Sequence, residues 1–355
     1  MITRRQTRPV SVGTVVIGGG APVTVQSMTN TDTRDVDATL AQIARLFSAG
    51  CEIVRVAIPH ADALPGFAQV CAQSPLPVVA DVHFDYRLAI EAARAGAAKL
   101  RINPGNIGSM DRVDAVVDAA GEAGIPVRIG VNAGSLAEEY RDRDWPLAEK
   151  LAASAVTFCE HIVSRGFEDV VVSAKASSVG ATIDAYRSLA RELPYPLHIG
   201  VTEAGTLIRG TVKSAVGLGV LLAEGIGDTL RVSLTADPHE EVIVAWEILA
   251  SLDIRRRGPE LVSCPTCGRC EVDLVPIAVE VEERLGPMDV PLKIAVMGCV
   301  VNGPGEARDA DVGVACGKGV GLIFRAGEPV RKVDEAHIVD ALFEEIESIA
   351  AERSS

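Results

Sequence analysis

Two neighbouring segments, Lys99-Leu-Arg-Ile-Asn103 and Val127-Arg-Ile-Gly-Val-Asn132, decide the fold of this chain. Each is a short apolar strand pattern with a basic residue inside it, and a helical pattern ending at Gly124 lies between them. Apolar strands that alternate with helices indicate a parallel sheet, because the strands of such a sheet are buried on both faces. The same alternation continues on both sides of these segments.

The strand patterns of the first 254 residues share one form, in which a run of Val, Ile and Leu precedes an amphipathic helical pattern. They are Val23–Met28, Glu52–Ile58, Val78–His83, Lys99–Asn103, Val127–Asn132, Asp169–Ala174, Leu197–Val201 and Thr229–Ser233. Eight such units match the roughly 250 residues of a (β/α)8 TIM barrel. A doubly wound open sheet is the alternative, but no switch point interrupts the run, so a closed barrel is favoured.

The 355 residues are enough for this barrel and a second, smaller module. Pro238–Ile254 is predicted to be the last barrel helix, and Arg255-Arg-Arg-Gly-Pro259 to be a linker. We therefore expect residues 1–254 to form the barrel and residues 255–355 a small α/β module. The elements predicted in that module are a helix at Leu274–Leu285, strands near Leu292–Met297, Asp311–Ala315 and Gly321–Arg325, and a helix from Glu335.

The composition narrows the range of partners. A formal net charge of −14 argues against binding to nucleic acid or to an anionic membrane surface. No apolar run reaches the roughly 18 residues of a transmembrane helix. The basic N-terminus runs into a Gly-rich stretch rather than an apolar one, so a signal peptide is not expected and the chain is predicted to be cytoplasmic.

Barrel enzymes place their chemistry at the carboxyl ends of the strands. Basic residues inside or just past the predicted strands are Arg55, Arg101, Arg128, Lys175 and Arg231. An unpaired buried cation is costly, and arginine binds phosphate oxygens in pairs, so cations on several strands of an acidic chain indicate a diphosphate-sized ligand. For any single cation, a structural ion pair with a carboxylate such as Asp81 or Glu52 is the alternative.

Other polar residues near the predicted strand ends complete the set of candidates. They are Asp81, His83, Asn103, Asn132, Glu203 and Ser233. Asp81, His83 and Glu203 are candidates for proton transfer, and Glu203 is favoured as a general acid near a leaving oxygen. Asn103, Asn132 and Ser233 are expected to contact substrate, although such residues also occur as hydrogen-bonded core groups.

The cysteines of the second module form a separate pattern. Cys264-Pro-Thr-Cys267-Gly-Arg-Cys270 places two thiols on one tight turn, and Cys299 follows a strand pattern and opens a Gly/Pro-rich loop that contains Glu306. Soft thiolates suit an iron–sulfur cluster or zinc. The spacing alone is compatible with a zinc site that uses Cys270 and with a cluster that has Glu306 as its fourth ligand. A carboxylate is displaced from iron more readily than a thiolate, so such a cluster would have one iron open to substrate.

Both cysteine motifs, including Met297-Gly-Cys299-Val-Val-Asn302-Gly-Pro-Gly-Glu306, closely resemble those of the bacterial 4-hydroxy-3-methylbut-2-enyl diphosphate synthases. The resemblance extends to Val25-Gln-Ser-Met-Thr-Asn30 and His198-Ile-Gly-Val-Thr-Glu-Ala-Gly205, and so covers nearly the whole chain. It implies a TIM barrel followed by a sulfite-reductase-like iron–sulfur module. It also implies reductive ring opening of 2-C-methyl-D-erythritol 2,4-cyclodiphosphate with loss of water, on the methylerythritol phosphate route to isoprenoids.

The resemblance further implies a [4Fe-4S] cluster whose ligands are Cys264, Cys267, Cys299 and Glu306, with Glu306 displaced by a substrate oxygen. Electrons would come from reduced flavodoxin or ferredoxin, and the cluster module of one subunit would cap the barrel of its partner in a homodimer. Cys270 stands where this family usually has a non-thiol residue, and we expect its side chain to diverge from the ligands. The rival interpretations are a zinc-ribbon module on a phosphate-binding barrel and a barrel transferase such as the pterin-condensing synthases.

Overall fold

The computed structural model describes residues 2–299 and 309–354. The chain forms two compact units, Met1–Arg255 and Arg256–Ser355. Each unit is described here by itself.

The first unit contains an eight-stranded parallel sheet in the order β8-β7-β6-β5-β4-β3-β10-β9. A further parallel bridge between Val172 and Leu197 joins β8 to the segment that leads into β9, so the sheet closes into a barrel. The predicted TIM barrel is therefore confirmed, and the open sheet is excluded. The strands are β3 (Thr24–Met28), β4 (Ile53–Ala57), β5 (Val78–Asp81), β6 (Lys99–Ile102), β7 (Val127–Asn132), β8 (Val170–Lys175), β9 (His198–Ile199) and β10 (Thr229–Leu230).

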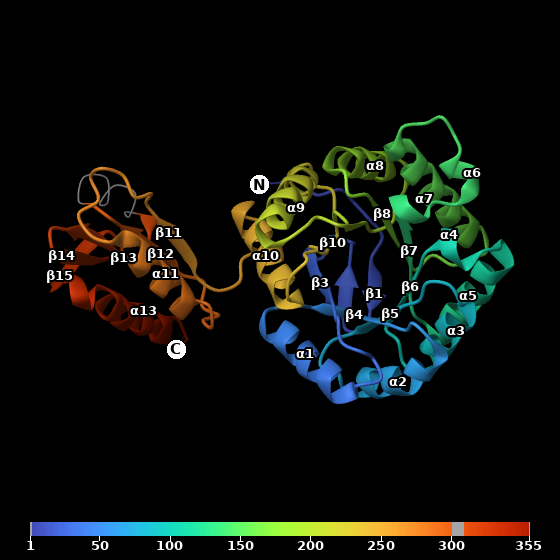
Figure 1. The fold of residues 1–355 in the computed structure, drawn as a ribbon, viewed down its shortest axis with the longest axis horizontal. Coiled ribbons are helices and arrows are strands. Elements are labelled where there is room, and N and C mark those ends of the chain that lie inside the picture. Colours follow the sequence, from blue (N-terminus) through green and yellow to red (C-terminus); the bar gives the residue numbers. More distant parts are fainter. Residues whose placement is uncertain (1, 300–308, 355) are drawn as a thin grey trace. The chain divides into compact units, whose positions relative to one another are not determined.

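Helices surround these strands as an outer ring (Figure 1). Several of them end at glycines with positive φ, such as Gly50 (98°) and, as predicted, Gly124 (64°). Residues with a Cβ rarely adopt this conformation. The helices are α1 (Val36–Ser48), α2 (Leu64–Gln73), α3 (Tyr86–Arg94), α4 (Pro104–Ile107), α5 (Met110–Ala123), α6 (Glu138–Arg141), α7 (Leu147–Ser164), α8 (Val179–Glu192), α9 (Leu207–Ala223) and α10 (Pro238–Ser251).

An N-terminal hairpin of β1 (Val10–Val12) and β2 (Val15–Ile17) closes the floor of the barrel. Its Val12 and Ile17 side chains pack in one buried cluster with Ile53 and Val79. Ile53 is the first residue of β4 and Val79 the second residue of β5. The barrel floor is therefore apolar, and the site is built above it.

The second unit is a five-stranded sheet in the order β11-β12-β13-β14-β15. The first three strands are parallel and the last two antiparallel, and the two helices share one buried cluster with the sheet. The predicted strands and helices of this module are present, whereas β11 and β15 were not predicted, because β11 is short and β15 is a polar edge strand. The elements are β11 (Glu260–Ser263), α11 (Leu274–Leu285), β12 (Lys293–Met297), β13 (Val312–Gly317), β14 (Val320–Arg325), β15 (Glu328–Asp334) and α13 (Ile338–Ser354).

Among the described residues, none of the helices combines the length and the apolar character that crossing a membrane would require.

Candidate active site

The interior of the barrel above its floor is lined by charged side chains. TIM barrels usually fill this space with branched apolar side chains. Here the buried polar residues of the strands include Lys99 and Arg101 on β6, Arg128 on β7 and Lys175 on β8. Because parallel strands present their carboxyl ends at one face, side chains that the sequence separates widely meet at the mouth.

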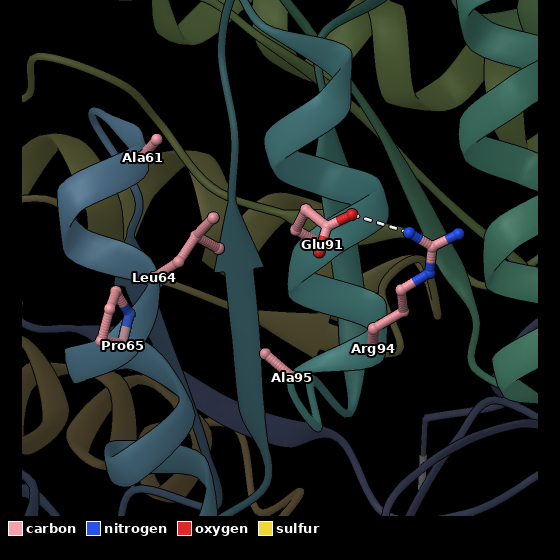
Figure 2. A pocket seen from close by; sticks show the side chains of 6 residues that line it. All are labelled: Ala61, Leu64, Pro65, Glu91, Arg94 and Ala95. Atoms are coloured by element: carbon pink, nitrogen blue, oxygen red, sulfur yellow. Dashed lines mark hydrogen bonds and ion pairs between the residues drawn. The ribbon is translucent and has the colours of Figure 1, made fainter.

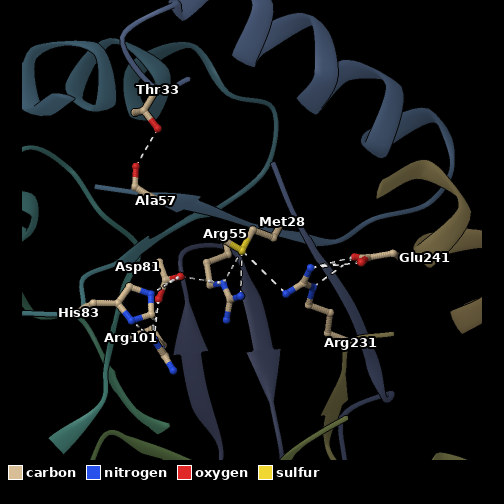
Figure 3. A network of polar contacts seen from close by, with 9 residues as sticks. All are labelled: Met28, Thr33, Arg55, Ala57, Asp81, His83, Arg101, Arg231 and Glu241. Atoms are coloured by element: carbon tan, nitrogen blue, oxygen red, sulfur yellow. Dashed lines mark hydrogen bonds and ion pairs between the residues drawn. The ribbon is translucent and has the colours of Figure 1, made fainter. Parts of the chain in front are cut away.

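Asp81, at the end of β5, is the centre of the first polar network (Figure 3). Its carboxylate accepts a hydrogen bond from Arg101 Nη1 at 3.1 Å and lies 3.5 Å from Arg55 Nε and 3.3 Å from His83 Nε2. Burial alone would raise the pKa of Asp81, but the charges of Arg55 and Arg101 and the contact with His83 hold it well below its usual range. Asp81 is therefore an ionised carboxylate that orients two cations.

A second ion pair joins Arg231 to Glu241 on α10, with a closest separation of 3.2 Å. Arg55 and Arg231 both point toward the sulfur of Met28, and Arg55 Nη2 lies 2.8 Å from it (Figure 3). Burial lowers the pKa of Arg55 to about 10 despite the attraction of Asp81. These contacts hold the guanidinium groups of Arg55 and Arg231 beside Met28.

Arg128 and Lys175 differ from these paired cations. Within the described part of the chain, neither forms an ion pair, and Arg128 Nε and Nη1 are buried without a hydrogen-bond partner. Burial and neighbouring cations lower the pKa of both side chains well below their ordinary values. Among the described residues the mouth thus contains more basic side chains than carboxylates that pair with them. A multiply charged anion bound there would stabilise their protonated forms.

Below the mouth lies a deeper layer of buried polar groups. Lys99 Nζ and both ring nitrogens of His198 have no hydrogen-bond partner among the described residues. Burial, reinforced by the surrounding cations, lowers the pKa of His198 well below 6.5, so its imidazole is neutral. The sequence places both residues on strands, but nothing in it predicts that they are left unpaired.

Two glycines, Gly130 in β7 and Gly200 just after β9, make room for the basic side chains. A Cβ at Gly200 would lie 2.5 Å from Lys175 Nζ and 2.6 Å from the carbonyl oxygen of Arg231. A Cβ at Gly130 would lie 2.8 Å from Arg101 Nε. Real Cβ atoms do not approach other atoms so closely, so the absence of side chains at these positions lets the cations cross their neighbouring strands.

The other predicted site residues take different positions. Asn132, with its amide oriented to satisfy both of its polar atoms, accepts from Arg101 Nη2 at 3.1 Å and so joins the Asp81 network. Asn103 caps α4 by accepting from Gly105 N at 3.1 Å and donates to Ser135, so both ends of its amide are already engaged. Ser233 is half-buried just beyond β10.

Glu203 follows β9 and is exposed to solvent. Its φ of 52° places it in the left-handed region, which a non-glycine residue rarely occupies. Backbone strain of this kind clusters at functional sites, so this conformation supports Glu203 as a candidate site residue.

In the second unit the cysteine motif follows β11 and lies beside the end of β12. Cys264 N donates to Val296 O at 3.2 Å, and Gly298 N donates to Cys264 Sγ at 3.1 Å. A tight turn follows, in which Cys270 N donates to Cys267 O at 2.9 Å; it spans Cys267 to Cys270 rather than the predicted Cys264 to Cys267. Cys267 is exposed, and hydrogen bonds from the backbone and side chain of Arg269 lower the pKa of its thiol.

The expectation that the side chain of Cys270 diverges is wrong. A Cβ on Gly298 would lie 2.5 Å from Cys270 Sγ and 3.5 Å from Cys264 Sγ, so both sulfurs lie on the same side of Gly298. Cys299 is the next residue along the chain and is buried. Glu306 lies outside the described residues, and the residues described do not by themselves present a group of three metal-binding side chains. The neighbouring thiols nevertheless have the soft donor chemistry that iron–sulfur clusters and zinc require.

Glu241 and Met28 contribute to the site but were not predicted. The acidic residue lies on a helix whose first turn also holds Glu240, and no pattern in the sequence singles out one of them. A pocket on the outer surface between α2 and α3 lies away from these networks, and its charged lining residues Glu91 and Arg94 pair with each other at 2.7 Å (Figure 2). This pocket gives no indication of a ligand.

The fold and the site define a TIM-barrel protein with basic side chains at its mouth and a separate cysteine-bearing module. The family model described as the GcpE TIM-barrel domain matches residues 7–246, and the model described as the GcpE protein C-terminal domain matches residues 260–348. The chain belongs to the GcpE family.

Similar proteins include chains named 4-hydroxy-3-methylbut-2-en-1-yl diphosphate synthase (flavodoxin). The relative from Geobacter sulfurreducens is 56% identical over 351 residues, covering 99% of both chains. The relative from Symbiobacterium thermophilum is 55% identical over 353 residues, covering 99% of this chain and 95% of its own. Among solved structures, dihydropteroate synthase from Stenotrophomonas maltophilia matches 70% of this chain and 97% of its own with a TM-score of 0.52 and 15% identity. That likeness supports the barrel fold alone.

Proposed function

We propose that this protein is an enzyme that converts 2-C-methyl-D-erythritol 2,4-cyclodiphosphate to (E)-4-hydroxy-3-methylbut-2-enyl diphosphate by two-electron reductive ring opening with loss of water. The observation that carries the proposal is the set of buried basic side chains at the barrel mouth that pair with no carboxylate among the described residues, represented by Arg128 and Lys175. A diphosphate supplies the negative charge that they lack. The name shared by the relatives supports the same reaction.

The thiols of the second unit fit a [4Fe-4S] cluster by donor chemistry and by their placement near the ends of adjacent strands. Cys264, Cys267 and Cys299, with Glu306 as an oxygen ligand, would hold it. When bound, such a cluster supplies electrons one at a time. All eight cysteines are free, which suits the reducing cytoplasm in which we propose that the enzyme works.

The cations at the barrel mouth would bind the diphosphate of the substrate. Arg55, Arg101 and Arg231 are oriented by carboxylates, and together with Arg128 and Lys175 they would bind the diphosphate. Asn132 and Ser233 would contact substrate beside these cations. Asn103 would act mainly by fixing the loop at α4, because its amide is engaged there.

We assign proton transfer to the exposed carboxylate of Glu203. Glu203 would donate a proton to the leaving oxygen, since it is the strained, solvent-facing residue at the end of β9. His83 contacts Asp81 and would assist by orienting it. The ionised state of Asp81 makes it a positioning group for Arg55 and Arg101.

The electron donor would be flavodoxin, which the relatives' names include, or ferredoxin.

We also propose a homodimer in which the cluster unit of one subunit caps the barrel of its partner. The last barrel helix, α10, runs away from the carboxyl ends of the strands, so the chain leaves the barrel at the face opposite its mouth. Mixed dimers of Cys299→Ser and Arg55→Met subunits should regain activity that neither homodimer has, and no recovery would count against capping in trans.

The reaction is tested by incubating anaerobically purified protein with the cyclic diphosphate and a chemical reductant. Product should form, and iron and sulfide should be present in the protein. Protein that contains about one zinc and no iron, and forms no product, would instead favour a zinc-ribbon module on a phosphate-binding barrel.

A further inference from the structure

Cys270 is a thiol that is not among the proposed cluster ligands. It is half-buried at the end of the turn that begins at Cys267. Its sulfur makes one hydrogen bond within the described residues, to Val272 O at 3.3 Å, which is a weak contact for a thiol. The side chain is therefore positioned, but its sulfur makes no strong hydrogen bond within the described residues.

The backbone directs this thiol toward Cys264. Glu271 N donates to Gly298 O at 3.1 Å, which ties the end of the cysteine turn to the end of β12. Gly298 has no side chain, and the space above its Cα is occupied by Cys270 Sγ and, slightly further away, by Cys264 Sγ. A side chain at Gly298 would clash with Cys270 Sγ, so this sulfur can lie where it does because Gly298 has none.

Cys316 shows what a purely structural thiol in this unit is like. It is the residue before the last of β13 and has no exposed surface. Cys270 is instead partly accessible and stands beside a proposed metal ligand. Neighbouring thiolates are the kind of ligand that soft metals prefer.

We propose that Cys270 is an additional thiolate ligand of the metal site in the second unit, beside Cys264. Where the metal is the cluster, this inference rests on the proposed function. Cys270 would then compete with Glu306 for one metal position, and a metal centre bound by it would be closed to substrate. The thiol would retain the metal when the oxygen ligand is absent.

Cobalt titration of the metal-free protein under anaerobic conditions tests the thiol without requiring a cluster. The absorbance of thiolate-to-cobalt charge transfer follows the number of sulfur ligands, so Cys270→Ser should lose about one quarter of it if four thiolates bind. Cys71→Ser, which removes a half-buried thiol from the barrel unit, should leave the spectrum unchanged. Equal cobalt spectra for wild type and Cys270→Ser would overturn the proposal.

A double substitution extends the test to iron. Glu306→Ala should keep most of the iron of the wild-type protein, whereas Glu306→Ala with Cys270→Ser should lose it severalfold. Equal iron contents in these two variants would also overturn the role of Cys270. Wild-type protein without iron, but with a Cys270-dependent cobalt spectrum, would refute the cluster while supporting the additional ligand, so the two failures are distinguishable.

Discussion

The side chain of Arg101 on β6 lies against the backbone of Gly130 on β7, with Nε 2.8 Å from the point where a Cβ would stand. From there its guanidinium reaches Asp81 on one side and Asn132 on the other. A glycine in the middle of a strand weakens the strand by itself. Its presence here is explained by the cation that crosses it.

Gly130→Ala should therefore weaken anion binding by displacing Arg101. We expect the Kd for inorganic pyrophosphate to rise about tenfold, equivalent to about 1.4 kcal/mol. Isothermal titration calorimetry would measure it. Gly180→Ala is the matched control, because no atom lies within 4 Å of a Cβ built there. Equal affinities in the two variants would show that Arg101 can move aside without loss.

Removing an unpaired cation should stabilise the free protein while impairing binding. Arg128→Met takes away a buried charge that has no carboxylate partner, so the free energy of unfolding should rise by about 1–3 kcal/mol. Arg101→Met should instead lower it, because Asp81 would lose its closest cation. Chemical denaturation of both variants measures the difference, and pyrophosphate should bind each more weakly. A destabilised Arg128→Met protein would mean that Arg128 is paired in the free state.

Diphosphate binding should be accompanied by proton uptake. In the free protein, burial and nearby cations hold the pKa of Lys175 well below its ordinary value of 10.5, which favours the neutral amine. A bound anion favours the protonated form and raises this pKa, so affinity should fall as the pH rises through the lowered value. Calorimetry in buffers of different ionisation enthalpy counts the protons, and Lys175→Met should take up fewer. Proton release on binding would contradict the assignment.

Glu203→Gln should reduce kcat with little change in KM, because the amide keeps the shape of the side chain but cannot donate a carboxyl proton. A loss of about 10²–10⁴-fold is expected for a general acid. Steady-state kinetics with the cyclic diphosphate measures it. Full turnover by this variant would remove Glu203 from the proposed mechanism.

The barrel could be predicted from the sequence because its strands and helices repeat one local pattern. The strand-end cations could be predicted too, because a basic residue inside an apolar strand such as Val127–Asn132 is conspicuous. The sequence suggested Asp81 and Glu52 as possible partners, but it could not say which cations pair. Arg55 and Arg101 bind Asp81, whereas Arg128 has no partner among the described residues, and this depends on barrel geometry. Glu52 pairs with Arg255, so it does not serve the mouth at all.

The position of Cys270 is the clearest limit of sequence reasoning in the second unit. The turn that contains Gly268 gave no reason to expect its sulfur near Cys264, and the backbone bond between Glu271 and Gly298 that brings it there joins segments far apart in the sequence. Such contacts are set by the packing of β11 beside β12.

Anaerobic turnover with reduced flavodoxin tests the central claim most directly, with wild-type and Cys299→Ser proteins compared at equal concentration and their iron content measured. The wild-type protein, loaded with iron and sulfide, should form (E)-4-hydroxy-3-methylbut-2-enyl diphosphate from the cyclic diphosphate, and Cys299→Ser should form little or none. An iron-loaded wild-type protein that leaves the substrate unchanged, or a Cys299→Ser protein that matches its rate, would contradict the account.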